Sequence, residues 1–390
     1  MERYKILFVL FTNIKTGAGT EKSLYNYLKY ADTSKFDITV LQTNRIQGGQ
    51  RLNDSDLDLI KDKVNFIETE DYISPYKFIN SKYFKYLFDF FGLYVLFKIL
   101  RFVKYKKIIN LDVYDVVYLF DNYYSYLFSR KSIVIGSNHC AFDDPNSFKQ
   151  KLSARLISLN MLFPSISAFH LFPQNISLER YLGRTPLIKL SNGVNPDLYF
   201  PQNNHNLKTK ILFVGRLEKN KGVLMVLKIY ESIKKIFQAE LIIVGSGSLE
   251  EEVDKACIDD NSIKHFKNLR ENDLANIYRS CDILLNPTTF DTYSLVVLEA
   301  LSSGLKVVTT NLLYNVYSDF IKFNVIRFAN FDEKQLIEAL IDIKDKNIDK
   351  NVIHDYIEKN YSWKVVSERL FDSMNNICIK KKIEKLHSGS

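Results

Sequence analysis

Short apolar runs alternate with amphipathic stretches along most of the chain. The runs are rich in Ile, Val, Leu and Phe with few polar interruptions, as expected of strands buried on both faces of a parallel sheet. Helical patterns such as residues 21–30 separate them. In the first half the runs occupy residues 5–11, 36–42, 114–120, 132–137 and 166–172, and in the second half residues 210–215, 239–245, 281–286 and 305–310.

This order predicts an α/β protein with two Rossmann-like domains, each built on a doubly wound parallel sheet. A polar stretch at residues 203–206 separates the two sets of strands. We expect one domain at residues 1–200, a second at 201–360 and a long helix at 361–386. Ligands of such domains bind at the carboxyl ends of the strands, so the two domains would face a shared central cleft.

Composition narrows the class of protein. The chain is 46% hydrophobic and 25% charged, which excludes a disordered chain and suits two globular cores. The apolar run at the N-terminus is too short for a signal peptide, and no run of 18 uncharged apolar residues predicts a membrane span. A net charge of +8 favours anionic partners. The scattered cysteines suggest no metal or disulfide framework and favour a cytoplasmic protein; they are Cys140, Cys257, Cys281 and Cys378.

Two turns after predicted strands carry candidate ligand-binding glycines. Gly17 and Gly19 lie between the first strand and the first helix, where backbone N–H groups are available to an anion. The spacing lacks the third glycine of a dinucleotide fingerprint, and a plain strand-to-helix turn explains it equally well. Gly245 and Gly247 follow a second-half strand and would allow close packing beside a base or ribose, although a generic turn has the same composition.

Two cations follow the first strand of the second half. Arg216 and Lys221 lie five positions apart in the segment 215–222. A guanidinium fork matches phosphate oxygens, and a lysine adds a mobile point charge, so the pair suits a diphosphate. The alternative is an exposed loop with two solvated cations.

The segment 286–304 is the most informative. Its helical part, from Ser294 as predicted cap to Gly304 as predicted stop, is apolar on all sides apart from Glu299. Such a helix is buried, and a buried carboxylate needs donors, for which ligand hydroxyls are suitable. Asp291 stands eight positions before Glu299, and the helix N-terminus would direct N–H groups into the same space. The alternative is a Glu299 paired with a buried Arg or Lys.

The segment resembles the paired-acidic signature of retaining glycosyltransferases of family 4, which have the GT-B fold. That signature has two Glu residues separated by seven positions, as Asp291 and Glu299 are here. Other landmarks of the family follow in the expected order over nearly the whole chain. They are the glycine turn at 17–23, the exit from the first domain at 191–200, the Arg and Lys of 215–222, and the helix start at 361–363.

The resemblance implies roles for individual residues. Glu299 would bind the ribose hydroxyls, and Asp291 would contact the transferred sugar. Arg216 and Lys221 would neutralise the diphosphate. The backbone amides of Ser294 and Leu295 would bind the phosphates, and His139 would lie near the reacting sugar. The residues themselves add further candidate donor-binding positions: Gly17, Gly19, Gly245 and Tyr293. A structural role for His139 is the alternative.

This chain departs from the family pattern in two places. Asp291 is one methylene shorter than the usual Glu, and Tyr293-Ser294 replaces the usual Phe-Gly. Both changes bear on the donor sugar and its pose more than on the fold.

The resemblance implies transfer of a sugar from a UDP- or GDP-linked donor to an acceptor hydroxyl, with the anomeric configuration retained. The first domain would bind the acceptor, a glycan or lipid-linked glycan of cell-surface polysaccharide or glycolipid synthesis. Cations of the protein would replace a divalent metal ion, no other cofactor is expected, and the leaving phosphate would help to deprotonate the acceptor. Two other functions fit the same features: a sugar-nucleotide epimerase of the same fold, and a non-catalytic nucleotide-sugar-binding or membrane-adaptor protein.

Residues 71–107 raise the question of a membrane. They hold eight Lys or Arg, two Asp and thirteen aromatic residues, a composition suited to an interfacial helix on an anionic membrane. The chain would then be peripheral at the inner face of the cell membrane. Helices packed on the first sheet with solvated lysines are the alternative. Nucleic acid suits the net charge, but no nucleic-acid-binding module supports it.

Overall fold

The computed structural model describes residues 3–10, 12–16, 19–44, 52, 54–69, 109–120, 132–137, 167–173, 179, 185–203, 207–267, 269–291 and 293–388. The chain divides into two compact units. One combines Met1–Ser191 with Val366–Ser390, and the other is Asn192–Val365. The first boundary therefore falls after Ser191, whereas the sequence pattern predicts it after residue 200. The second falls inside the C-terminal helix and not at its start.

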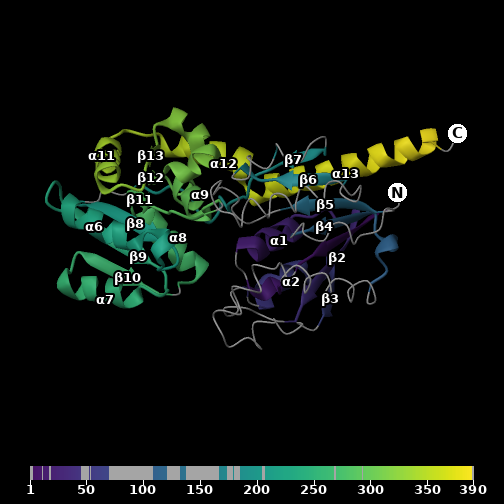
Figure 1. Ribbon diagram of the computed structural model, residues 1–390, viewed down its shortest axis with the longest axis horizontal. Coiled ribbons are helices and arrows are strands. Elements are labelled where there is room, and N and C mark those ends of the chain that lie inside the picture. The colour runs from purple at the N-terminus through teal and green to yellow at the C-terminus, as the bar shows by residue number, and fades with distance from the viewer. Residues whose placement is uncertain are drawn as a thin grey trace, which may run out of the picture. The chain divides into compact units, whose positions relative to one another are not determined.

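The first unit contains a seven-stranded sheet of order β3-β2-β1-β4-β5-β6-β7 (Figure 1). Every pairing is parallel, with Tyr4 opposite Phe36 and Ile6 opposite Val116. The strands are Tyr4–Val9 (β1), Phe36–Thr43 (β2), Val64–Thr69 (β3), Val116–Leu119 (β4), Ile133–Ser137 (β5), Ala168–Leu171 (β6) and Leu187–Lys189 (β7). The described helices and 3-10 turns between them are Ile14–Thr16 (η1), Gly19–Lys29 (α1), Asp54–Lys61 (α2) and Leu111–Val113 (η3).

The long C-terminal helix α13 (Trp363–Ser388) packs on this first sheet. The ring of Phe371 lies 5.1 Å from Phe36 and 6.3 Å from Phe8, centroid to centroid. Nearer the end of the helix, Lys381 Nζ donates to the Ser132 carbonyl at 3.0 Å. No helix in the described ranges combines the length and apolar character that crossing a bilayer requires.

The second unit contains a six-stranded parallel sheet of order β10-β9-β8-β11-β12-β13 (Figure 1). Its strands are Thr209–Val214 (β8), Ala239–Val244 (β9), Ile263–Phe266 (β10), Ile283–Asn286 (β11), Lys306–Thr310 (β12) and Ile326–Ala329 (β13). Its helices are Val223–Ile233 (α6), Glu250–Asp259 (α7), Glu271–Ser280 (α8), Leu295–Ser302 (α9), Tyr314–Tyr317 (α10), Glu333–Lys344 (α11) and Lys350–Tyr361 (α12). The 3-10 turns are Lys219–Lys221 (η6), Asn311–Leu313 (η7) and Ser318–Phe323 (η8).

Alternating side chains of this sheet enter two separate cores. In β8, Ile211 and Phe213 pack with α6, α7 and α11, whereas Leu212 between them packs with α8, α9 and α12. This alternation follows from the period of two in a strand, and burial on both faces explains why the strand sequences are continuously apolar. Helices therefore cover both faces of the sheet, and the carboxyl ends of the strands are left to the loops.

The predicted strands are confirmed, but four of the strands in the described residues were not predicted: β3, β7, β10 and β13. These four are the edge strands of the two sheets. An edge strand has one neighbour and is partly exposed, so it carries polar residues such as those in the sequence of β10, Ile-Lys-His-Phe. The continuous apolar signal that reveals an internal strand is therefore weak at an edge.

His170 on β6 is fully buried in the first sheet. Its Nδ1 lies 2.6 Å from the Tyr118 hydroxyl and its Nε2 lies 3.3 Å from the Leu190 carbonyl. The ring stacks on Phe172 at 4.1 Å. The Leu190 carbonyl can only accept, so Nε2 carries a proton. Burial favours the neutral ring, in which Nδ1 accepts from the Tyr118 hydroxyl. Burial lowers the pKa of His170 to about 4.

We expect this histidine to make the first unit sensitive to acid. Unfolding restores the ordinary pKa of about 6.5, so below that pH the unfolded chain binds a proton that the folded chain does not. The free energy of unfolding should therefore fall by roughly 3 kcal/mol as pH drops from 6.5 to 4. Urea unfolding of the wild type and His170→Gln at several pH values measures this contribution of His170. The same dependence of unfolding free energy on pH in both proteins would contradict it.

Candidate functional site

The carboxyl edge of the second sheet brings together three of the segments selected from the sequence. Strands β9, β8 and β11 are adjacent and parallel, so the loops that follow them leave the sheet side by side. These loops are 215–222, 245–249 and 287–294. They contain Arg216, Lys221, Gly245 and Asp291, although Asp291 lies 70 positions beyond Lys221.

Backbone packing holds the three loops together. A Cβ atom on Gly245, whose φ is +146°, would lie 1.9 Å from the Gly215 carbonyl oxygen. A Cβ atom on Gly222, whose φ is +81°, would lie 2.2 Å from the Pro287 carbonyl oxygen. Both positions therefore require glycine for protein-to-protein contact. A role of Gly245 beside a nucleotide stays a prediction, because the packing already accounts for the glycine.

Hydrogen bonds reinforce this packing. Leu217 N donates to the Ser246 carbonyl at 3.0 Å, and Leu249 N donates back to the Leu217 carbonyl at 2.9 Å. On the other side, Thr289 N donates to the Asn220 carbonyl at 2.9 Å. The β8 loop is thus fixed from both sides, which fixes the positions of the cations that it carries.

The two predicted phosphate-binding cations have different surroundings. Lys221 Nζ lies 2.7 Å from Asp291 Oδ2, and the side chains are only 19% and 15% exposed. Arg216 lies 2.8 Å from Glu218, with its side chain 60% exposed. An exposed ion pair contributes little and exchanges readily with solvent, whereas the half-buried pair is screened less. Lys221 is therefore the preorganised cation of this edge, and Arg216 can reorient toward a ligand.

Asp291 also closes the N-terminus of α9. Its Oδ1 accepts from Ser294 N at 3.2 Å while Oδ2 accepts from Lys221. A carboxylate at this position satisfies one of the unpaired N–H groups of the helix and interacts favourably with the helix dipole. In this structure the carboxylate thus occupies the place where an anion would bind, and the Ser294 amide predicted for phosphate is engaged by Asp291.

The prediction that the Ser294 side chain caps α9 is wrong. Ser294 has φ 52° and ψ 69°, in the left-handed region, and its side chain makes no capping hydrogen bond. Instead Ser294 Oγ accepts from Asn286 Nδ2 at 2.9 Å. The backbone turns through a conformation that suits glycine, which points Oγ back to the end of β11 and leaves the cap to Asp291.

Buried tyrosines fix the same turn. Tyr317 donates to the carbonyl oxygens of Tyr293 at 2.8 Å and Ser294 at 3.1 Å. Tyr293 is itself buried and donates to the Asn192 carbonyl at 3.2 Å. Tyr293 therefore anchors the loop inside the unit. The sequence reasoning missed both Asn286 and Tyr317. A polar residue at the end of a buried strand was the available signal for Asn286, and nothing in the local pattern marks Tyr317.

Glu299 is buried, as the apolar helix predicts, with 6% of its surface exposed. Its Oε2 accepts from the Tyr278 hydroxyl at 3.1 Å, so a tyrosine of α8 is a protein donor that the sequence did not reveal. Burial raises the pKa of Tyr278 well above its ordinary value, and the Glu299 charge raises it further. Tyr278 is therefore a permanent donor to this carboxylate.

Further site predictions concern residues of the first unit, most of which the structure does not describe. Gly17, His139 and the interfacial segment 71–107 lie outside the described residues. Gly19 is the first residue of α1 in the first unit, and a Cβ atom there would meet nothing within 4 Å. Within the described ranges, no three His, Cys, Asp or Glu residues gather closely enough to hold a metal ion. The expectation of a metal-independent reaction stays a prediction.

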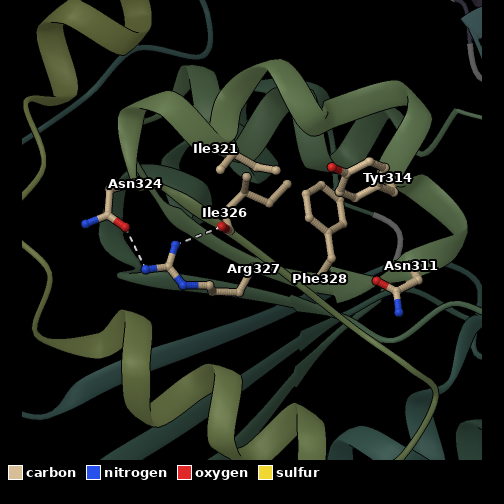
Figure 2. A pocket seen from close by; sticks show the side chains of 7 residues that line it. All are labelled: Asn311, Tyr314, Ile321, Asn324, Ile326, Arg327 and Phe328. Carbon is tan, nitrogen blue, oxygen red and sulfur yellow. Dashed lines mark hydrogen bonds between the residues drawn. The ribbon is translucent and has the colours of Figure 1, made fainter.

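A separate pocket of about 440 Å³ opens beside the edge strand β13. Figure 2 shows Arg327 there, donating to Asn324 and to the Ile326 carbonyl, at 2.6 Å and 3.0 Å. Strands β11 and β12 separate β13 from β8, and the pocket lining includes no predicted site residue. The lining consists of Asn311, Tyr314, Ile321, Asn324, Ile326, Arg327 and Phe328. The candidate site is therefore the loop cluster and not this pocket.

Part of the second unit is similar in sequence to known proteins. Residues 208–345, which lie within the second unit, match the family described as glycosyl transferases group 1. An uncharacterized glycosyltransferase of Methanocaldococcus jannaschii is 30% identical over 106 residues, which cover 26% of this chain and 27% of that protein. The UDP-Gal:alpha-D-GlcNAc-diphosphoundecaprenol alpha-1,3-galactosyltransferase of Escherichia coli is 29% identical over 192 residues, covering 44% of this chain and 48% of that protein. The chain thus spans less than half the length of both relatives.

The fold has wider similarity. The structure of HepE from Anabaena in complex with UDP and glucose superposes with a TM-score of 0.66 at 12% identity, covering 96% of this chain and 100% of that one. Identity at this level shows the fold alone. The prediction of a GT-B fold with two Rossmann-like, parallel-sheet domains is confirmed.

We expect the left-handed conformation of Ser294 to be measurable. Ser294→Gly and Ser294→Ala both remove the bond from Asn286, but only glycine relieves the strained backbone. Ser294→Gly should therefore be more stable than Ser294→Ala by about 1–2 kcal/mol in urea unfolding. Ser303, at φ −80°, is the control, because there alanine should be the more stable replacement. Equal stability of the two Ser294 variants would contradict the backbone assignment.

Proposed function

We propose that this chain, whose residues 208–345 match the glycosyl transferases group 1 family, transfers a sugar from a nucleoside diphosphate sugar to an acceptor hydroxyl with the anomeric configuration retained. One observation carries the proposal. The half-buried Lys221 and Asp291, 70 positions apart, meet at the N-terminus of α9, with Glu299 buried on the same helix. A cation and helix amides suit the diphosphate of such a donor. One carboxylate can then accept from the sugar hydroxyls and the other from the ribose hydroxyls.

Charge development explains the use of these groups. As the bond between sugar and phosphate breaks, negative charge grows on the departing diphosphate and positive charge on the anomeric carbon. Lys221 and the α9 amides would stabilise the negative charge on the diphosphate. The Arg216 guanidinium would also bind the diphosphate once it leaves Glu218. The bound diphosphate competes with Asp291 for Lys221, so donor binding would release Asp291 Oδ2 to accept from a sugar hydroxyl. Glu299 would hold the ribose.

The leaving diphosphate would itself receive the proton of the acceptor on the same face of the sugar. Because Lys221 and Arg216 supply positive charge, we expect no divalent ion to be required. Transfer should therefore continue in excess EDTA, and full recovery of a lost activity on adding Mg²⁺ or Mn²⁺ would contradict this part of the proposal.

Relatives support the proposed donor and acceptor class. The name of the Escherichia coli relative specifies a UDP-linked sugar and an acceptor on diphosphoundecaprenol. We extend this to a UDP- or GDP-linked donor and a glycan or lipid-linked acceptor, as in the synthesis of cell-surface polysaccharide. A lipid-linked acceptor would fit peripheral attachment at the inner membrane face through residues 71–107. Sedimentation with anionic liposomes at low salt tests that attachment.

Removal of the donor-binding charges gives a direct test. Lys221→Ala should weaken binding of UDP or GDP, measured by calorimetry, at least about tenfold, because a hydrogen bond between charged groups is lost. Glu299→Ala should abolish binding of the nucleotide sugar. Lys228→Ala and Glu231→Ala remove exposed charges of α6 and serve as controls. Wild-type affinity in both site variants would refute the donor site.

Asp291→Asn separates binding from transfer. The amide keeps an oxygen for the Ser294 amide but lacks the charge, so transfer should fall about a hundredfold. Affinity for the nucleoside diphosphate should be unchanged or higher, because the competing anion is gone. Asp273→Asn, at an exposed ion pair, is the control.

Product analysis by NMR reports the anomeric configuration. Inversion would contradict the mechanism. Release of nucleoside diphosphate only when acceptor is present would argue against an epimerase.

A further inference from the structure

Three elements of the second unit converge on Glu299. Tyr278 comes from α8, Glu299 from α9, and Tyr199 from the segment that precedes β8. The Tyr278 hydroxyl donates to Glu299 Oε2 at 3.1 Å, and the rings of Tyr199 and Tyr278 meet edge to face at 5.5 Å. Both tyrosines are at most 1% exposed, so they cannot themselves reach a ligand.

The tyrosines are held firmly in place. Ser302 at the end of α9 donates to the Tyr199 carbonyl at 2.5 Å. Arg279, next to Tyr278, donates to the Leu198 carbonyl at 2.6 Å. The segment around Tyr199 is therefore tied to α8 and to α9 at once, and Tyr278 has little freedom to move away from Glu299.

We propose that Tyr278 is a positioning residue, whose hydroxyl orients the Glu299 carboxylate toward the ribose hydroxyls of the donor, with Tyr199 packing Tyr278 in place. The inference rests on the proposed function, because it assigns a partner to the residue proposed to bind ribose. A carboxylate offers about four acceptor positions, so it can accept from Tyr278 and from ligand hydroxyls together.

A tyrosine suits this task better than a cation. A buried Lys or Arg would neutralise Glu299 and weaken it as an acceptor. A neutral hydroxyl satisfies only part of the hydrogen-bonding capacity of the carboxylate and leaves its charge for the ligand. Burial and the Glu299 charge raise the pKa of Tyr199 as well, so both hydroxyls keep their protons.

Nucleotides with and without ribose hydroxyls test the proposal. Calorimetry would compare UDP and GDP with their 2′,3′-dideoxy counterparts on full-length wild type and Tyr278→Phe. For whichever of UDP and GDP the wild type binds more tightly, the variant should have about tenfold lower affinity than the wild type. The reason is that the Glu299 carboxylate loses the hydrogen-bond donor that fixes its orientation. Its affinity for the dideoxy counterpart should equal that of the wild type, because no ribose hydroxyl then contacts Glu299.

Tyr230→Phe is the matched control. Tyr230 is also buried in this unit and donates to the Ala239 carbonyl at 2.9 Å, on the other face of the sheet. It should lose stability without losing nucleotide affinity. If Tyr278→Phe does not fold, Glu299→Asp, which draws the carboxylate back from Tyr278 and keeps its charge, should show the same loss of preference for ribose.

The outcomes separate the two proposals. Unchanged affinity in Tyr278→Phe, or an equal loss for ribose and dideoxy nucleotides, overturns the positioning role and leaves the proposed function intact. A wild type that binds neither UDP nor GDP overturns the proposed function and this role with it.

Discussion

Backbone packing at the carboxyl edge of the second sheet is the constraint on which the candidate site depends. The loops after β8, β9 and β11 approach so closely that Gly222 and Gly245 have no room for a Cβ atom. Parallel pairing brings the strand ends to one edge, and these contacts then fix the loops against each other. Lys221 stands next to Gly222 and so meets Asp291 at 2.7 Å across the junction. A side chain at either glycine would separate the loops and the ion pair with them.

The site also shows how a protein can occupy its own anion site. Asp291 neutralises Lys221 and accepts from the first amide of the turn into α9, two interactions that a diphosphate would otherwise make. Buried pairs of this kind lose solvation, and their net contribution to stability is small, so exchange with a stronger anion is feasible. Glu299 is handled differently. Its carboxylate accepts from the Tyr278 hydroxyl and lies on a helix whose other residues are mostly apolar, which holds it in one orientation.

The strand pattern shows how far local sequence carries the fold. Internal strands are covered on both faces and paired on both sides, so they consist of nearly continuous apolar residues. Such apolar runs are easy to recognise in the sequence. Edge strands such as β10 and β13 combine one neighbour with partial exposure, and their mixed composition resembles that of loops. The helix α9 was predictable for the same reason as the internal strands, because an apolar sequence on all sides has to be buried.

The sequence by itself determined the two parallel-sheet units, the internal strands and the burial of Glu299, because each follows from local periodicity or from the cost of burying a charge. Only the tertiary structure decided which groups meet. The pairing of Lys221 with Asp291, the capping of α9 by Asp291 in place of Ser294, and the approach of Tyr278 to Glu299 join residues from different elements. Such contacts depend on the order and spacing of packed strands and helices, which no local pattern contains.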